Sequence, residues 1–164
     1  MPLQLFTIGV YGTDEATFFD ALSRHRITHF VDVRALRGLR GGEYRYANAA
    51  ALQRRLEEMG IAYQHRKDLA PDAETRRLQA LKDKEAGIAR RERSSVSEEF
   101  RRLYRERVLS NFDPEAFVAA FPKSARVALF CVEAKPEACH RSLLAGAIAR
   151  ALGIRWRDIT PAAK

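Results

Sequence analysis

Five short runs rich in β-branched and aromatic residues alternate with stretches of helical spacing, and this alternation constrains the fold most strongly. The predicted strands cover residues 4–10, 29–33, 61–65, 126–132 and 154–159. Strands that alternate with helices usually pair in parallel, because each connection crosses back over the sheet. The sequence therefore predicts an α/β fold: a single-domain, mostly parallel five-stranded sheet with helices on both faces and Rossmann-like layering.

Capping signals place the ends of the helices. Thr13 and Asn48 are the expected N-caps of the first two helices, and Asp113 precedes a proline at a third helix start. A last long helix should begin near Cys139 and end at Gly153. Between the second of these helices and the helix start at Asp113, residues 72–111 have a helical pattern and are highly charged. We expect this segment to be a partly mobile insertion within the domain.

Length and composition narrow the class of protein. The chain has 164 residues, which fits one domain spanning 1–164. No apolar run approaches the roughly 20 residues of a membrane helix, and the first residues lack the basic start of a secretion signal. Two cysteines make a disulfide scaffold unexpected. These features predict a soluble, cytoplasmic protein that does not bind membranes.

The net charge of +8 is concentrated in two stretches. Residues 34–45 carry four arginines against one glutamate, and residues 76–107 carry eleven basic against six acidic residues. Together they account for the whole excess. A localised basic surface attracts polyanions, so nucleic acid or a phosphorylated small molecule is the expected partner. An arginine-rich composition without any binding role would give the same charge.

The densest cluster of reactive side chains follows the fourth predicted strand and leads into the last helix. It comprises Cys131, Glu133, Cys139, His140 and Arg141. The unpaired N–H groups of a helix N-terminus favour anions and thiolates there. We therefore assign candidate catalytic roles to Cys131, Glu133 and His140, and candidate ligand-binding roles to Cys139 and Arg141.

Several types of chemistry fit this cluster. A metal site could use Cys131, Glu133, Cys139 and His140. However, neighbouring residues on a helix point about 100° apart, so Cys139 and His140 should not share one ion, and no metal is predicted. The other possibilities are a reversible disulfide between the cysteines, a thiol nucleophile with His140 or Glu133 as base, and a purely structural role. The cysteine-to-arginine spacing excludes phosphatase and rhodanese loops.

Two other strand ends should meet the same edge of the sheet, since ligands of open α/β sheets bind beyond the carboxyl ends of strands. Asp32 and Arg34 flank a valine and either pair with each other or hold a polar ligand; Asp32 is also a candidate catalytic group. Gly9 either lets a ligand approach the backbone or makes an ordinary turn. Tyr44 lies in an arginine- and glycine-rich loop suited to phosphate contact and base stacking.

These residues resemble the domain of unknown function family 488. The resemblance rests on Thr7-Ile8-Gly9, Asp32-Val33-Arg34, Leu56…Gly60-Ile61-x-Tyr63 and the C-x-E-x5-C-H-R run from Cys131 to Arg141. It implies an α/β fold and a shared polar edge made by Asp32, Arg34, Cys131, Glu133, Cys139, His140 and Arg141. It implies no particular reaction. The family usually has Leu-Gly-Gly after its third strand, where this chain has Leu69-Ala70-Pro71.

The leading functional hypothesis is a strand-end site that binds a phosphate-bearing ligand, either nucleic acid or a nucleotide, with thiol-dependent chemistry. Arg34, Arg141 and the N-terminus of the last helix would bind the anion. One alternative is a non-enzymatic module that docks on nucleic acid or an acidic protein through residues 76–107. The other is a thiol redox sensor. The sequence identifies no cofactor and leaves catalysis and oligomeric state open.

Overall fold

A computed structural model describes residues 2–163 and contains one five-stranded, all-parallel sheet. The strands are β1 (Gln4–Ile8), β2 (His29–Asp32), β3 (Ala62–His65), β4 (Arg126–Phe130) and β5 (Trp156–Ile159). Their order across the sheet is β3-β2-β4-β1-β5. The α/β prediction is therefore confirmed, with parallel pairing throughout.

The sheet core is made by β4 and β1, its two most enclosed strands. Residues 127–130 of β4 and residues 5–8 of β1 are all buried. Strands covered on both faces carry near-continuous apolar runs rather than alternating ones, as β4 does with its Val-Ala-Leu-Phe run. Both end two residues earlier than predicted. Beyond them the amides of Val10 and Tyr11 both donate to the carbonyl of Val132, which interrupts the regular ladder.

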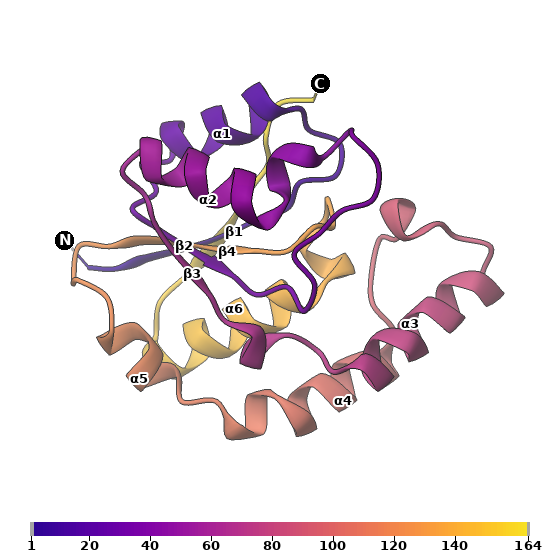
Figure 1. Cartoon of the computed structure of the whole chain (residues 1–164). Helices are drawn as coiled ribbons and strands as arrows, with labels where there is room; N and C mark the ends of the chain where they lie inside the picture. The colour runs from indigo at the N-terminus through magenta and orange to yellow at the C-terminus, as the bar shows by residue number, and fades with distance from the viewer. Residues whose placement is uncertain (1, 164) are drawn as a thin grey trace.

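Residues 2–163 contain six α-helices. They are α1 (Glu15–Arg24), α2 (Ala49–Glu58), α3 (Ala73–Glu85), α4 (Glu98–Arg107), α5 (Pro114–Ala119) and α6 (His140–Leu152). Figure 1 shows α1 and α2 on one face of the sheet and α5 and α6 on the other, as predicted. Within the described part of the chain, no helix is long and apolar enough to cross a bilayer.

The predicted N-cap of α1 is wrong, whereas that of α2 is right in position but not in its side-chain bonding. The N-cap of α1 is Asp14, whose carboxylate accepts from the amide of Thr17 at 2.8 Å. Thr13 is buried instead, and its hydroxyl lies 2.6 Å from the hydroxyl of Tyr46. Asn48 does precede α2, but its side chain accepts from the amide of Leu39 at 2.6 Å. Both side chains thus fix the loop after β2 rather than a helix end.

The cap predictions at the other two helices are confirmed. Asp113 accepts from the amide of Ala116 at the start of α5, with Pro114 in the first turn. Gly153 ends α6 with a left-handed φ of +64°, a conformation that glycine adopts without a steric penalty.

The charged segment 72–111 folds into α3 and α4, which extend past the edge of the sheet (Figure 1). A small apolar cluster of Val96, Phe100 and Tyr104 anchors it. The hydroxyl of Tyr104 donates to the carbonyl of Leu69 at 2.7 Å, and its ring lies 5.4 Å from that of His140. The segment therefore packs beside the start of α6, at the strand ends.

Candidate functional site

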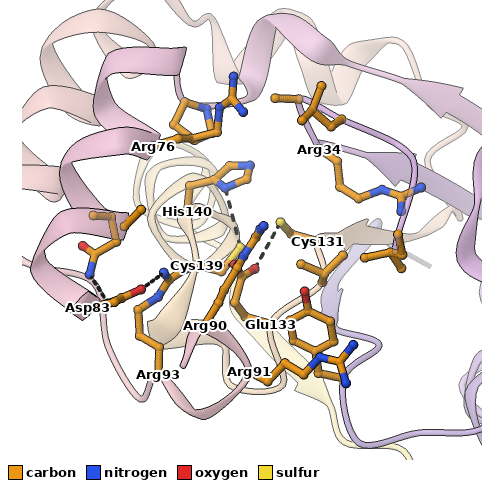
Figure 2. A pocket seen from close by; sticks show the side chains of 18 of the residues that line it. Arg34, Arg76, Asp83, Arg90, Arg91, Arg93, Cys131, Glu133, Cys139 and His140 are labelled. Atoms are coloured by element: carbon orange, nitrogen blue, oxygen red, sulfur yellow. Dashed lines mark hydrogen bonds and ion pairs between the residues drawn. The ribbon is translucent and has the colours of Figure 1, made fainter. Parts of the chain in front are cut away.

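A cavity of about 640 Å³ opens where the carboxyl ends of β2 and β4 face α3 (Figure 2). Its wall includes Arg34, Cys131, Glu133, Cys139 and His140 from the strand-end edge. The cavity is strongly basic. Its seven arginines are Arg34, Arg40, Arg76, Arg77, Arg90, Arg91 and Arg93, and its acids are Asp83 and Glu133.

Asp32 and Arg34 form a buried ion pair. Arg34 donates from Nε and Nη2 to the two carboxylate oxygens at 2.9 and 2.8 Å, and Tyr63 donates its hydroxyl to the same carboxylate at 2.7 Å. Arg34 is only 3% exposed, and its guanidinium lies 4.7 Å from the ring centre of Phe130. The third nitrogen, Nη1, is buried with no hydrogen-bond partner among residues 2–163. The N–H groups of Arg34 Nη1 are therefore not used by the described part of the protein.

Glu133 connects the arginine wall to the thiols. Its Oε1 accepts from Arg90 Nε and Arg93 Nη2, both at 2.9 Å. Its Oε2 accepts from the thiol of Cys131 at 3.3 Å. Burial alone would raise the pKa of Glu133, but the adjacent charges of Arg90 and Arg93 lower it to about 2. Glu133 is therefore a carboxylate at neutral pH.

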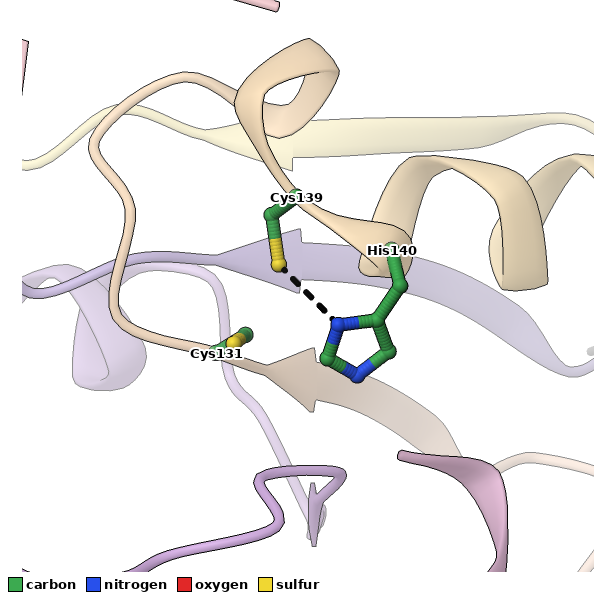
Figure 3. Close-up of side chains that lie close together, drawn as sticks. All are labelled: Cys131, Cys139 and His140. Atoms are coloured by element: carbon green, nitrogen blue, oxygen red, sulfur yellow. Dashed lines mark hydrogen bonds between the residues drawn. The ribbon is translucent and has the colours of Figure 1, made fainter. Parts of the chain in front are cut away.

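Cys131, Cys139 and His140 converge at the floor of the cavity (Figure 3). Their ligating atoms all lie within 4.8 Å of one another, and His140 Nδ1 is 3.5 Å from Cys139 Sγ. The expectation that Cys139 and His140 diverge is wrong, because it assumed helical backbone at both. Cys139 is the N-cap of α6, with φ −148° and ψ 160°, so its side chain turns toward that of its neighbour.

The helix N-terminus does not lower the pKa of Cys131. Cys131 directly follows β4 and is separated from the first turn of α6 by a loop. A hydrogen bond with Cys139, together with burial, raises the pKa of Cys131 well above its usual range. Cys131 is therefore a protonated thiol at neutral pH, and it donates to Glu133.

Arg141 lies outside the cavity and is fully buried. Its guanidinium donates to the carbonyls of Glu133 and Ala134 and to the carboxylate of Asp158. It thereby holds the loop after β4 against β5. Arg141 was predicted to bind the anion, but its side chain does not line the cavity.

Gly9 is required for a close approach, but the approaching group is the protein's own backbone. A Cβ at this position would lie 1.9 Å from the carbonyl oxygen of Glu133 and 3.1 Å from Nη1 of Arg141. Neither the ligand approach nor the ordinary turn considered from sequence describes this contact. Gly9 lets the end of β1 pass beneath the loop that carries Glu133.

Tyr44 is buried and supports the rim of the cavity. Its hydroxyl accepts from the amide of Gly12 at 2.9 Å. The guanidinium of Arg91 lies 5.1 Å from the ring centre of Tyr44 and 5.4 Å from that of Tyr11. Of the two tyrosines, Tyr11 lines the cavity. The more accessible ring is therefore one that the sequence analysis did not select.

Arginines of the inserted segment also belong to this site, which was not predicted from the sequence. Arg76 lines the cavity, and its Nε is buried without a hydrogen-bond partner in the described structure. Arg93 donates to Asp83 at 2.7 Å as well as to Glu133. The charge of segment 76–107 was a visible signal, but only the fold places it opposite Arg34.

Comparison with known proteins identifies the family. A family model described as "Domain of unknown function DUF488" matches residues 15–148. The chain belongs to the DUF488 family. The DUF488 match covers every candidate site residue from Asp32 to Arg141 and excludes Gly9. In the comparisons with curated proteins and with solved structures, no protein matches this chain.

Proposed function

We propose that this protein binds a phosphate-bearing ligand of nucleotide size in the arginine-lined cavity, either a nucleotide or the end of a nucleic-acid strand. The observation that carries the proposal concerns buried arginine nitrogens without a hydrogen-bond partner among residues 2–163. Two of the three, Arg34 Nη1 and Arg76 Nε, belong to residues of the cavity wall, and the third is Arg141 Nε outside it. An unpaired buried donor costs about 1–3 kcal/mol, and more when it is charged. The oxygens of a bound phosphate would supply the acceptors that the two donors of the cavity wall lack.

The remaining arginines favour an anion over a neutral ligand. Four of the seven guanidinium groups are in ion pairs with Asp32, Glu43, Asp83 or Glu133. The other three are in no ion pair among residues 2–163: Arg40, Arg76 and Arg77. Guanidinium groups bind phosphate with two parallel hydrogen bonds, which gives both energy and orientation. The excess positive charge in a partly enclosed space therefore supports binding of a multiply charged phosphate.

The size of the cavity supports a nucleotide rather than a duplex. Small-molecule sites typically enclose about 300–1,000 Å³, and this cavity has about 640 Å³. At its rim Tyr11 is held beside Arg91, and such an aromatic–arginine pair suits base stacking. Thiol chemistry is not part of the proposal, because the raised pKa of Cys131 keeps its thiol protonated.

The test is binding of fluorescent mononucleotides and of short single- and double-stranded oligonucleotides across a salt series. Arg76→Gln removes a cavity donor that is in no ion pair of the described structure. Losing one charge-assisted hydrogen bond of about 1.5–3 kcal/mol weakens affinity about 10- to 150-fold. The matched control is Arg102→Gln in the same charged segment, since Arg102 pairs on the surface with Glu106 and does not line the cavity. We expect its affinity to stay within twofold of the wild type.

Two results would contradict the proposal. No binding of any probe at low salt would remove the anion site. Equal losses from Arg76→Gln and Arg102→Gln would place the contact on the outer surface of the segment, which is the docking alternative. Inorganic pyrophosphate should displace the bound nucleotide, because the phosphate groups carry the recognition.

A further inference from the structure

We propose that Cys131, Cys139 and His140 form a binding site for a tetrahedral divalent cation, with zinc as the best-matched ion. The three side chains come from the end of β4 and the start of α6 and are all buried. This inference does not rest on the phosphate site. Two cysteines and one histidine are a donor set that zinc uses in proteins.

The spacing of the donor atoms matches tetrahedral coordination. With Zn–S bonds of about 2.3 Å and Zn–N bonds of about 2.0 Å, sulfur–nitrogen edges are about 3.5 Å and sulfur–sulfur edges about 3.8 Å. His140 Nδ1 lies 3.5 Å from Cys139 Sγ, and all three donor atoms lie within 4.8 Å of one another. Movements of less than about 1 Å would bring all three donors to one ion.

The imidazole of His140 is oriented for this role. Its Nε2 lies 2.8 Å from the carbonyl oxygen of Val33, an acceptor only, so Nε2 carries the hydrogen. The lone pair of Nδ1 then faces the sulfur of Cys139, as Figure 3 shows. Metal-bound histidines typically donate their other ring N–H in this way, which fixes the tautomer and the ring plane.

Rigid elements hold both cysteines. Cys131 directly follows β4, and its amide donates to the carbonyl of Ile8 in β1. The sulfur of Cys139 lies 3.5 Å from the amide nitrogen of Arg141 in the first turn of α6. The thiol of Cys131 donates to Glu133 Oε2 at 3.3 Å, and this hydrogen bond would be lost when the thiol gives up its proton to bind the ion.

The fourth coordination position faces the cavity, because all three donors line it. Structural zinc sites usually have four protein ligands, whereas three protein ligands and an open position are typical of sites that bind water or a substrate oxygen. Binding of the ion releases the thiol protons to solvent, and the two thiolates that result balance the charge of a dication. The ion would therefore leave the positive charge of the surrounding arginines unchanged.

The test uses the full chain, reduced and freed of metal, and titrates it with Co²⁺ in a buffer without phosphate. Co²⁺ reports tetrahedral thiolate coordination through intense visible bands and a sulfur-to-metal charge-transfer band. We expect saturation at one Co²⁺ per chain and full displacement by Zn²⁺. Weak visible bands of octahedral Co²⁺, or no charge-transfer band, would overturn the proposal.

Cys139→Ser tests the ligand set while preserving the helix start, because serine is a favoured N-cap residue. We expect Co²⁺ affinity to fall at least 100-fold, beyond the 10- to 100-fold typical of outer-shell losses. The matched control is His25→Gln, which changes a histidine at the end of α1 outside the cavity. Unchanged affinity in folded Cys139→Ser would refute the assignment.

A second measurement needs no variant. In the wild-type protein, Zn²⁺ should slow alkylation of both thiols, as followed by mass spectrometry. Equal alkylation with and without Zn²⁺ would overturn the metal site, as would a Cys131–Cys139 disulfide that forms regardless of Zn²⁺. These experiments contain no phosphate and measure only metal binding, so their failure would not contradict the proposed anion site.

Discussion

Replacing Gly9 by alanine tests the packing that creates the candidate site. The added Cβ would lie 1.9 Å from the carbonyl oxygen of Glu133, whereas real Cβ contacts stay beyond about 3.0 Å. Gly9 does not have a left-handed φ, so alanine meets no backbone strain there. The entire cost therefore comes from displacing the Glu133 backbone by about 1 Å.

That backbone cannot move freely. The carbonyl of Glu133 accepts a hydrogen bond from buried Arg141, and the adjacent Val132 carbonyl accepts from two amides that follow Gly9. Overpacking a well-filled interior costs about 1–3 kcal/mol, and a lost hydrogen bond to a charged group about 1.5–3 kcal/mol. Partial relaxation should leave a net loss of about 2–4 kcal/mol. For a chain of this length that lowers Tm by roughly 5–15 °C.

Thermal and urea unfolding measure this loss, with Gly38→Ala as the matched control. A Cβ at Gly38 meets no atom within 4 Å, so its stability should stay within about 0.5 kcal/mol of the wild type. Gly9→Ala should also weaken nucleotide binding, because Glu133 holds Arg90 and Arg93 in the cavity wall. If Gly9→Ala unfolds at the same temperature as Gly38→Ala, the tight approach of the loop to β1 is wrong.

Two further predictions concern pH. Burial raises the pKa of Tyr46 to about 12, against about 10 in an unfolded chain, so its contribution to stability is complete below pH 10 and is lost as the pH rises toward 12. From pH 9 to pH 11 the wild type should lose about 1.4 kcal/mol relative to Tyr46→Phe in urea unfolding, and parallel pH profiles would refute this. At the start of α3, a hydrogen bond from the amide of Thr75 and the charge of Arg107 lower the pKa of Asp72. Asp72→Ala should cost about 1 kcal/mol at pH 7, and the difference should shrink as the pH falls below 4; a constant difference would exclude a charged cap.

The fold could be predicted because its signals are local. Each strand of the sheet was predicted from a short run rich in β-branched and aromatic residues, and two of the four expected caps act as predicted. Where cap prediction failed, tertiary contacts had redirected the side chain: Thr13 bonds with Tyr46, and Asn48 with the loop after β2. Strand order was not predictable, since it depends on which long-range pairings bury most surface.

The candidate site was only partly predictable, because its two walls are distant in sequence. The edge formed by Asp32, Arg34 and residues 131–140 follows from parallel strands ending together. The opposing wall comes from α3 and the turn after it, and the sequence analysis treated that segment as a separate docking surface. In the structure Arg90 and Arg93 reach across to Glu133, so the two hypotheses describe two walls of one cavity.

Glu133 is the side chain that connects the two walls of the cavity. One carboxylate oxygen holds two arginines of the inserted segment, and the other accepts the thiol hydrogen of Cys131. A buried carboxylate is stable only when it is paired, and removing its partners would leave several kcal/mol of uncompensated desolvation. The arginines therefore do more than attract anions: they keep Glu133 charged next to the cysteines. The positions of Arg90 and Arg93 are in turn fixed by a residue of the C-x-E-x5-C-H-R run. Glu133 and the two arginines therefore depend on each other. This explains why the cavity needs the inserted segment 72–111 as well as the C-x-E-x5-C-H-R run.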